Sequence, residues 1–405
     1  MSKWEETRLG ELIEINPETL SVSKYTGEIK YIDIASVNTG SLEGYTTYEI
    51  SDAPSRARRI IKDKDIIFST VRPNLKAYYF VKNAPPNAIC STGFAVLRAK
   101  KGVNSRFVYS LVTENSFVDY LTLVAKGSAY PAVDTNDFKK AKVTVPDLHT
   151  QERIADILST YDDLIEANNH RIELLEQTAQ ELYKEWFVRF RFPGHEKVKF
   201  ENGLPEGWNV VKLGDYVDIK GGKRLPEGKT LCGRITEHPY IRIRDITASK
   251  FISLTNSFEY IDDETFDIIQ RFTVNTNDIL ISIVGTIGAI ACVGKSLNGA
   301  NLTENCVKLI NVRYFTNSFL YHFLNSDAGK GAIQAGIVGA TQPKLPLYNI
   351  KRIKLLKPGA DLIVAFTEVI EPIDHEIMTL MEKNRNLAAQ RDMLLPRLMS
   401  GKLEV

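Results

Sequence analysis

The chain has 405 residues, which is too many for one hydrophobic core and enough for two or three domains. Its composition is ordinary for a globular protein, with 43% hydrophobic residues, 25% charged residues and a net charge of +1. The longest apolar run, Ile279–Val293, is too short to span a membrane and predicts a buried hairpin or a strand–turn–strand unit. The polar start of the chain shows no secretory signal, and we therefore expect a cytoplasmic protein.

The sequence contains an internal repeat, which predicts a molecule with pseudo-two-fold character. The recurring pairs are Trp4/Trp208, Leu9/Leu213, Gly10/Gly214 and Ile15/Ile219, shifted by 204 residues, and then Phe107/Phe319, Tyr109/Tyr321, Gly127/Gly339, Pro131/Pro343 and Pro146/Pro358, shifted by 212. The repeat and the local patterns divide the chain into a first globular domain (1–149), a first long helix (150–190), a linker (191–207), a second globular domain (208–359) and a second long helix (360–405).

The two globular domains are expected to be mixed α/β, giving an α+β fold class. Strand-like runs do not alternate strictly with helices, so a doubly wound sheet is not favoured. The predicted strands are Tyr31–Ile34, Ile66–Phe68, Tyr78–Val81, Phe94–Leu97 and Val143–Val145 in the first domain, and Tyr240–Ile243, Ile279–Ile283, Ala289–Val293, Val307–Ile310 and Ile353–Leu355 in the second. Helical patches lie at Phe107–Leu111 and Phe319–Leu324.

Both long helices carry apolar residues at alternating spacings of four and three, which is typical of a coiled coil. Neither helix would be stable alone with this seam exposed, so we expect the two to pack as an antiparallel coiled coil. A symmetric register centred on residue 170 places Asn168 opposite Asn384, and such an asparagine pair would fix the register. Pro372 is expected to kink or restart the second helix, and Pro396 to end or bend it.

No motif for catalysis is found. The sequence has no G-x-S-x-G, H-E-x-x-H, phosphate-binding loop or dinucleotide-binding fingerprint, so we predict no catalytic residues. The four cysteines form no C-x-x-C pair, and we expect buried small hydrophobic side chains rather than a metal site or disulfides. The chain is thus predicted to be a binding and scaffolding protein.

Charge alternates with the repeat. Residues 1–150 carry 20 Lys and Arg against 17 Asp and Glu (+3), and residues 201–360 carry 19 against 15 (+4). The helical segments 151–200 (7 against 10) and 361–405 (5 against 8) are each −3. Mildly basic globular domains favour a polyanion as the partner, and a two-fold protein suits a two-part DNA target.

Candidate DNA contacts are basic and amide side chains that lie near glycines or in predicted loops. Arginine and lysine would contact phosphate, and a few Arg, Asn or Gln side chains would read base edges. The candidates are Arg56, Arg58, Arg59, Arg72, Asn74 and Lys76 in the first domain, and Lys220, Lys223, Arg224, Arg242, Arg244, Lys250 and Gln342 in the second. An ordinary solvated surface charge is the alternative for each basic residue. The turns 127–131 and 339–343, the second of which contains Gln342, have a purely structural role as their alternative.

The chain resembles the specificity subunit of type I restriction–modification enzymes over essentially its full length. The stretches that carry the resemblance are residues 146–154, 185–190, 203–208, 212–215, 339–343 (Gly-Ala-Thr-Gln-Pro) and 394–401. Their order and duplication make the match specific. The first copy of the Gly-Ala-Thr-Gln-Pro turn departs from that form, with Ala129 and Tyr130 where the second has Thr341 and Gln342.

The resemblance implies that each globular domain is a target recognition domain reading one half of a bipartite double-stranded DNA site. The helices would set the gap between the halves and dock two methyltransferase subunits, and motor–nuclease restriction subunits would join for cleavage. S-adenosylmethionine, ATP and Mg would be bound by those partners and none by this chain. Two alternatives stay open: a subunit of a fused restriction and methylation enzyme with its own activity, and a protein-interaction scaffold that does not bind DNA.

Overall fold

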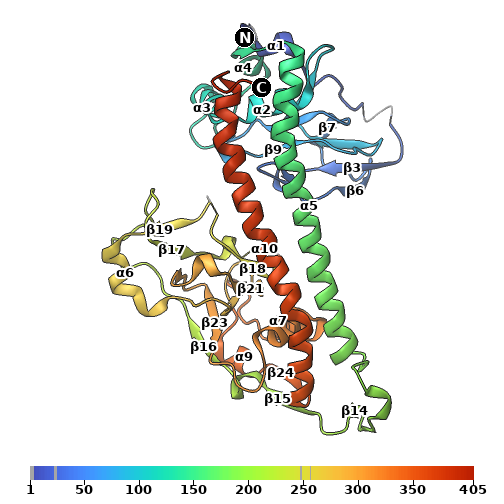
Figure 1. The fold of residues 1–405 in the computed structure, drawn as a ribbon, viewed down its shortest axis with the longest axis vertical. Coiled ribbons are helices and arrows are strands. Elements are labelled where there is room, and N and C mark those ends of the chain that lie inside the picture. Colours follow the sequence, from blue (N-terminus) through green and yellow to red (C-terminus); the bar gives the residue numbers. More distant parts are fainter. Residues whose placement is uncertain (1–3, 22–24, 247–248, 256) are drawn as a thin grey trace. The chain divides into compact units, whose positions relative to one another are not determined.

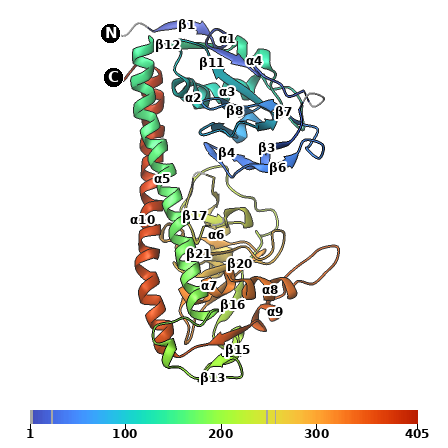
Figure 2. The same ribbon diagram turned by 90° about the vertical axis from the view of Figure 1, so that its right-hand side faces the viewer.

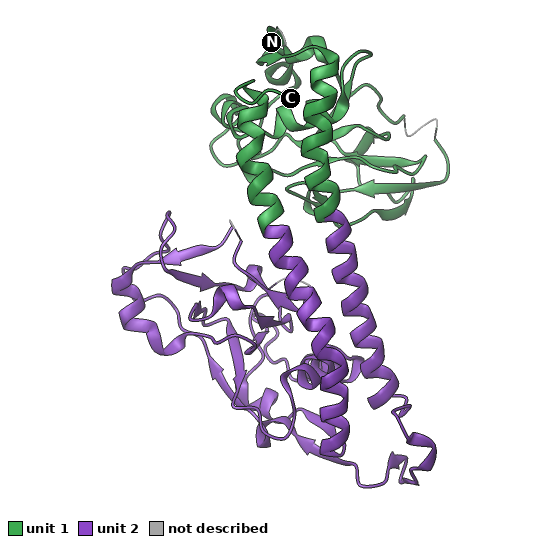
Figure 3. Ribbon diagram, viewed as in Figure 1, with its two compact units in different colours: residues 1–165, 386–405 green, residues 166–385 purple. Residues whose placement is uncertain are grey.

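The computed structural model describes residues 4–21, 25–246, 249–255 and 257–405 (Figures 1 and 2). The chain forms two compact units: unit 1 comprises residues 1–165 and 386–405, and unit 2 comprises residues 166–385 (Figure 3). Each unit contains one globular part and a portion of both long helices. The first expected domain begins at Met1, which lies outside the described residues.

Unit 1 is built on two four-stranded sheets, with strand orders β6-β3-β10-β7 and β2-β11-β8-β9. Smaller sheets pair β1 with β12 and β4 with β5. The strands are β1 (Glu5–Arg8), β2 (Ile13–Ile15), β3 (Glu28–Ile32), β4 (Val37–Asn38), β5 (Ser41–Leu42), β6 (Thr46–Glu49), β7 (Ala57–Ile60), β8 (Ile66–Ser69), β9 (Tyr78–Phe80), β10 (Ala88–Ser91), β11 (Phe94–Ala99) and β12 (Lys142–Val145). The short helices are α1 (Leu9–Leu12), α2 (Ser105–Thr113), α3 (Asn115–Val124) and α4 (Thr135–Lys140).

Unit 2 contains a five-stranded sheet, β16-β23-β20-β21-β18, and a three-stranded sheet, β19-β17-β22. Two-stranded sheets pair β13 with β14 and β15 with β24. The strands are β13 (Phe200–Glu201), β14 (Leu204–Pro205), β15 (Asn209–Lys212), β16 (Asp218–Gly221), β17 (His238–Ile241), β18 (Phe251–Ile252), β19 (Glu259–Ile261), β20 (Ile279–Ser282), β21 (Ile290–Val293), β22 (Asn301–Leu302), β23 (Cys306–Ile310) and β24 (Lys354–Lys357). The short helices are α6 (Asp263–Ile269), α7 (Asn317–Asn325), α8 (Asp327–Ala335) and α9 (Leu347–Lys351).

The sequence repeat is a structural repeat. The order β2-β11-β8-β9 in unit 1 matches β16-β23-β20-β21 in unit 2, and the antiparallel pair β1–β12 matches β15–β24. Three short helices, α2 to α4 and α7 to α9, follow the last strand of each large sheet. The predicted hairpin within Ile279–Val293 is confirmed, because β20 and β21 pair antiparallel. The mixed α/β character and the internal repeat are therefore both present.

The central strands are apolar because both faces of their sheet are covered. Successive side chains of a strand point to opposite faces. In β8, Ile66 and Phe68 join one hydrophobic cluster and Ile67 joins another. In β20, Ile279 and Ile281 join the cluster that contains the long helices, and Leu280 joins the cluster on the other face. Uninterrupted apolar runs therefore form strands here without polar alternation.

The long helices α5 (Leu148–Phe187) and α10 (Ala360–Met399) have 40 residues each and are continuous. The expectation that Pro372 restarts the helix or that Pro396 ends it is wrong, because α10 includes both residues; a kink or bend at them stays a prediction. Both prolines are exposed on α10, where the carbonyl left without a helical partner can be hydrated.

The two helices pair in opposite directions within each unit. In unit 2, the Asn168 side chain donates to Asn384 Oδ1 at 2.8 Å, and Arg171 Nη2 lies 3.0 Å from Glu376 Oε1. The predicted contact between Asn168 and Asn384 is thus present. In unit 1, Arg391 Nη1 lies 2.6 Å from Asp162 Oδ1. In these pairs the residue numbers rise along α5 as they fall along α10, so the antiparallel coiled coil is confirmed.

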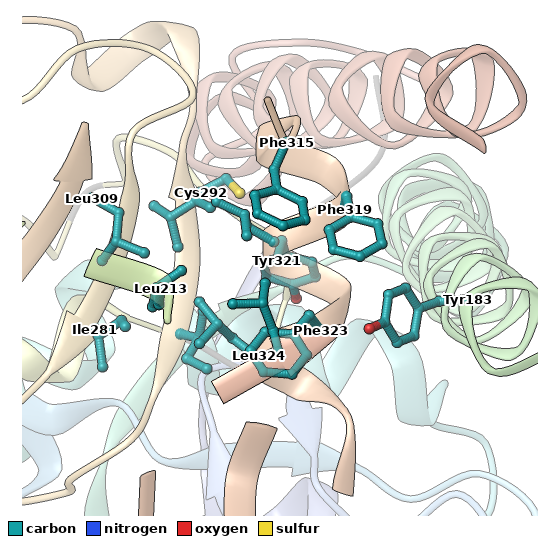
Figure 4. Packing of buried hydrophobic residues seen from close by; sticks show 14 of the residues in the cluster. Tyr183, Leu213, Ile281, Cys292, Leu309, Phe315, Phe319, Tyr321, Phe323 and Leu324 are labelled. Carbon is teal, nitrogen blue, oxygen red and sulfur yellow. The ribbon is translucent and has the colours of Figure 1, made fainter. Parts of the chain in front are cut away.

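Aromatic side chains connect the unit 2 sheet to the helices. Figure 4 shows Tyr183 of α5 on one side of Phe319 of α7 and Ile281 and Leu309 of the sheet on the other. The ring centroids of Tyr183 and Phe319 are 5.6 Å apart. Phe187 lies 4.8 Å from Phe319 between centroids, in an edge-to-face arrangement that aromatic rings favour. The helix α7 is therefore the layer between the sheet and the long helices of this unit.

A buried ion pair also fixes the globular part of unit 2 to α10. Lys250 is 2% exposed, and its Nζ lies 2.6 and 2.7 Å from the two carboxylate oxygens of Asp374. Ser318 of α7 donates to the same carboxylate at 2.8 Å. His322 Nε2 lies 3.5 Å from the ammonium, and burial, helped by this positive charge, lowers the pKa of His322 well below its ordinary value. The imidazole is therefore neutral in the folded protein.

We expect Asp374→Asn to destabilise unit 2 by about 3–5 kcal/mol, because the buried Lys250 ammonium loses its counter-charge. The measurement is urea unfolding in a Trp4→Phe background, in which the fluorescence of Trp186 and Trp208 reports on unit 2. The double variant Lys250→Met/Asp374→Leu should recover most of the loss, since it leaves no charge unpaired.

The matched control is Asp267→Asn, which removes an exposed carboxylate from the same unit. Its unfolding midpoint should stay within experimental error of the parent. An Asp374→Asn midpoint that also stays unchanged would show that the ion pair contributes nothing to folding.

Stability of unit 2 should fall as the pH drops below about 6.5, the ordinary pKa of histidine in an unfolded chain. His322 has a depressed pKa when folded, so below this pH the unfolded chain binds a proton that the folded chain does not. The stabilisation is complete above pH 6.5 and is lost on acidification. In His322→Gln, the free energy of unfolding should differ less between pH 7.0 and pH 5.5; an unchanged difference would contradict this assignment.

Candidate nucleic-acid interface

The first group of candidates consists of Arg56, Arg58 and Arg59. Two of them, Arg58 and Arg59, also make hydrogen bonds within unit 1. Arg58 and Arg59 lie half-buried on β7, an edge strand of its sheet, and Arg56 is exposed in the turn before it. Arg58 Nη1 donates to the Ala57 carbonyl at 2.8 Å. Arg59 Nη1 donates to Thr19 Oγ1 at 3.4 Å, and its Nε is buried without a hydrogen-bond partner among the described residues. Of these three, Arg56 is the most accessible to a ligand.

The second group, Arg72, Asn74 and Lys76, occupies the loop between β8 and β9, around the short 3₁₀ turn Pro73–Leu75. Arg72 and Lys76 both have left-handed backbone conformations, with φ of 49° and 54°. Lys76 Nζ donates to Asn115 Oδ1 at 2.6 Å, whereas Arg72 and Asn74 are exposed. The loop therefore presents a cation and an amide on the surface of unit 1.

Arg72 is attached to the turn 127–131 by three contacts. Its backbone N–H donates to the Pro131 carbonyl at 2.7 Å, and its Nη2 donates to the Ala129 carbonyl at 3.1 Å. Its guanidinium carbon lies 4.7 Å from the centroid of the Tyr130 ring, which suits a cation–π interaction. The loop after β8 and this turn, far apart in sequence, thus form one continuous surface.

The two copies of the turn have the same geometry. Residues Lys126 and Ala132 pair as an antiparallel bridge around the first copy, and Val338 and Lys344 pair in the same way around the second. Gly127 and Gly339 adopt φ of +106° and +94°, values that require glycine. The turn expected from glycine and proline is thus present in both copies, and a binding role of Gln342 stays a prediction. In the second copy, Gln342 is exposed at the tip.

In unit 2, several candidate cations are already paired with carboxylates. Arg224 Nε lies 2.8 Å from Glu304 Oε1, and this partner raises the pKa of Arg224. Arg242 is half-buried against Asp245 at 3.0 Å and Glu259 at 3.2 Å. Arg242 therefore mainly holds its own loop in place.

Three of the remaining unit 2 candidates, Lys220, Lys223 and Arg244, are exposed, as Arg224 also is. Arg244 is exposed and lies 3.4 Å from Glu259. Lys220 on β16 is exposed, as is Lys223, which lies 5.7 Å from the Phe272 ring. Lys220, Lys223, Arg244 and Gln342 are therefore the stronger candidates for an external ligand.

Lys250 requires a correction. The sequence placed it among the DNA contacts because it follows a group of arginines. The structure buries it at 2% exposure on the Asp374 carboxylate, so its ammonium is inaccessible to a phosphate or a base. No local sequence signal distinguishes Lys250 from a surface lysine, because its partner lies 124 residues away.

Tyr130 is an exposed residue beside Arg72 that the sequence reasoning does not select as a candidate. The sequence marks it only as a departure from the Gly-Ala-Thr-Gln-Pro form. Its side chain is 69% exposed, which is unusual for an aromatic residue held in a rigid turn. Comparison of the two repeats at this position, tyrosine against glutamine, could have marked it as a position where the two domains differ in chemistry.

The three buried cysteines lack the exposure and the lowered pKa of a reactive thiol. All four cysteines are free; Cys90, Cys292 and Cys306 are buried as expected, whereas Cys232 is partly exposed. Burial raises the pKa of Cys292 and Cys306 to about 12, so these thiols are protonated at neutral pH.

Among residues 4–21, 25–246, 249–255 and 257–405, no group of three or more His, Cys, Asp or Glu is placed to hold a metal ion. Within those same ranges, none of the helices has the length and apolar character needed to cross a membrane.

Relatives of this chain cover both repeats. It is 24% identical, over 473 aligned residues covering 100% of both chains, to the Type I restriction enzyme HindI specificity subunit of Haemophilus influenzae. It is 26% identical over 330 residues to the Type I restriction enzyme MjaIX specificity subunit of Methanocaldococcus jannaschii, covering 77% of this chain and 72% of the relative. The crystal structure of a Type-I restriction-modification system S subunit from M. genitalium has a similar fold, with a TM-score of 0.51, 16% identity and coverage of 98% and 96%.

The family match agrees with the repeat seen in the structure. The profile of the family described as "Type I restriction modification DNA specificity domain" matches twice, over residues 1–177 and 205–383. Each match contains one of the two large sheets, its three following short helices and at least part of one long helix. The resemblance drawn from the sequence is therefore confirmed: the chain belongs to the family of type I restriction modification DNA specificity domains.

Proposed function

We propose that the chain is the DNA specificity subunit of a type I restriction–modification complex. Each globular part would bind one half of a bipartite double-stranded DNA sequence. The single observation that carries this proposal is the duplication of one framework with different surface chemistry. The loop–turn surface of unit 1 carries Arg72 and Tyr130, and the equivalent turn of unit 2 carries Gln342. Two similar readers with different side chains suit two different half-sites.

The long helices would set the gap between the half-sites and dock two methyltransferase subunits. Each helix is continuous for 40 residues, which corresponds to about 60 Å at ~1.5 Å per residue. Several apolar side chains on them are exposed, including Leu164 and Leu174 on α5 and Val364 and Met393 on α10. Exposed apolar residues on otherwise polar helix faces are suited to contact with partner subunits.

The chemistry would belong to the partners. Methyltransferase subunits would bind S-adenosylmethionine, and motor–nuclease restriction subunits would bind ATP and Mg, while this chain would bind none of these cofactors and act without catalytic residues, in the cytoplasm. Its own contribution would be recognition: placing donors, acceptors and cations where only one base sequence satisfies them.

Binding of the assembled complex to duplex DNA should weaken as salt rises, with log affinity falling linearly with log salt concentration. Lys and Arg side chains that neutralise phosphates release bound counterions, and this release is less favourable at high salt. The measurement is fluorescence anisotropy of a labelled duplex between 50 and 300 mM salt. Affinity that does not change with salt would favour the protein-interaction scaffold instead.

Exchanging residues 1–149 for the corresponding domain of another family member should change one half of the methylated sequence and leave the other half unchanged. The reason is that each half-site would be read within one unit. Mapping methylated adenines in cells with the parent chain, the exchanged chain or no chain tests this. Methylation at the same sequence with all three would show that this chain does not specify the target.

A further inference from the structure

The backbone at Arg72 has a conformation that disfavours its side chain. Arg72 adopts φ of 49° in the left-handed region, where residues other than glycine are uncommon. The equivalent position in unit 2 is Gly285, with φ of 72°. The equivalence follows from the neighbouring bridges, Val71 with Ala132 in unit 1 and Val284 with Lys344 in unit 2. The fold therefore suits glycine at this position, and unit 1 keeps an arginine there at a cost.

The Arg72 side chain is ordered without being neutralised. Its guanidinium makes one hydrogen bond, to the Ala129 carbonyl at 3.1 Å, and lies 4.7 Å from the centre of the Tyr130 ring. No carboxylate lies within ion-pair distance of it in the described part of the chain, whereas Arg98 and Arg242 each contact two carboxylates. An exposed, oriented and unneutralised guanidinium is suited to a ligand that brings its own acceptors.

We propose that Arg72 and Tyr130 form the guanine-reading element of unit 1. Tyr130 holds the guanidinium in one plane, and two parallel N–H groups of Arg72 donate to O6 and N7 of a guanine in the major groove. Arginine fits these two acceptors bidentately, and stacking on an aromatic ring reduces the freedom that the side chain loses on binding. This inference rests on the proposed function and adds to it the residue pair and the base.

The element is absent from the equivalent surface of unit 2. That surface has Gly285 in place of the arginine, and Gln342, with an amide instead of a ring, at the tip of the turn. The proposal therefore restricts the effect of Arg72 to a guanine in one half of the bipartite sequence. A phosphate contact by Arg72 would instead affect all sequences alike.

The test uses the full complex with its partner subunits and begins with the methylated sequence of the parent chain. The informative variant is Arg72→Gly, because glycine already occupies the equivalent position in unit 2 and relieves the backbone strain. We expect Arg72→Gly to lose about 10- to 100-fold discrimination at one guanine of one half-site. Arg72→Lys should lose discrimination similarly although it keeps the charge. Tyr130→Ala should show a smaller loss at the same guanine, and Tyr130→Phe should behave like the parent.

A duplex in which 7-deazaguanine replaces that guanine removes the N7 acceptor and provides the second measurement. Its binding to the parent complex should weaken, and its binding to the Arg72→Gly complex should weaken no further. The control is Arg8→Ala, which removes an exposed arginine of β1 that is not a candidate contact and should leave this guanine fully discriminated. Equal weakening on all sequences by Arg72→Gly, with the salt slope reduced by about 1, would overturn the base-reading proposal and leave the proposed function intact. Failure of the parent complex to bind any sequence specifically would instead refute the proposed function.

Discussion

Each large hydrophobic core of this protein is closed by residues from both long helices. In unit 1, Ile154 and Leu158 of α5 and Leu398 of α10 belong to the cluster that covers the sheet β2-β11-β8-β9. In unit 2, residues of α5 from Ile172 to Phe187 and of α10 from Ile363 to Leu380 belong to the cluster on the corresponding sheet. Burial of apolar surface is the main favourable term in folding, so neither core can form fully until the two helices have paired. This antiparallel pairing is the constraint on which the fold depends.

The two repeats place the same acidic position of the long helices in different ion pairs. Asp162 of α5 and Asp374 of α10 are equivalent positions, 212 residues apart. In unit 1 the carboxylate is paired with Arg391 on the other helix, at 2.6 Å. In unit 2 it is paired with Lys250, which comes from the segment just before β18, also at 2.6 Å. The framework thus keeps a carboxylate at one position, and each unit has its own cation for it.

The surface that we assign to DNA also combines a framework shared by both units with side chains that differ between them. The bridges around the turns and the positive φ values of Gly127 and Gly339 are common to both units, because they hold the backbone in place. The side chains at the tips differ, because they are not needed for that role. A chain of this design can change the bases it reads by changing a few exposed residues while its cores stay unchanged.

The sequence by itself determined the features that depend on local periodicity and on the repeat. The spacing of apolar residues gave both helices, their antiparallel pairing and the contact of Asn168 with Asn384, because a symmetric repeat leaves one register that aligns the seams. Apolar runs gave most of the strands. Proline disfavours a helix interior, yet α10 continues through the exposed Pro372, because the apolar residues on either side of it are packed in the core of unit 2.

Only the tertiary structure decided which charged residues are free to bind a ligand. Lys250 and Arg72 look alike in the sequence as basic residues near turns, yet one is buried on a carboxylate and the other is exposed over an aromatic ring. Their partners, Asp374 and Tyr130, lie 124 and 58 residues away along the chain. The energy of a charge depends on what surrounds it in space, and long-range packing, which no local pattern encodes, fixes those surroundings.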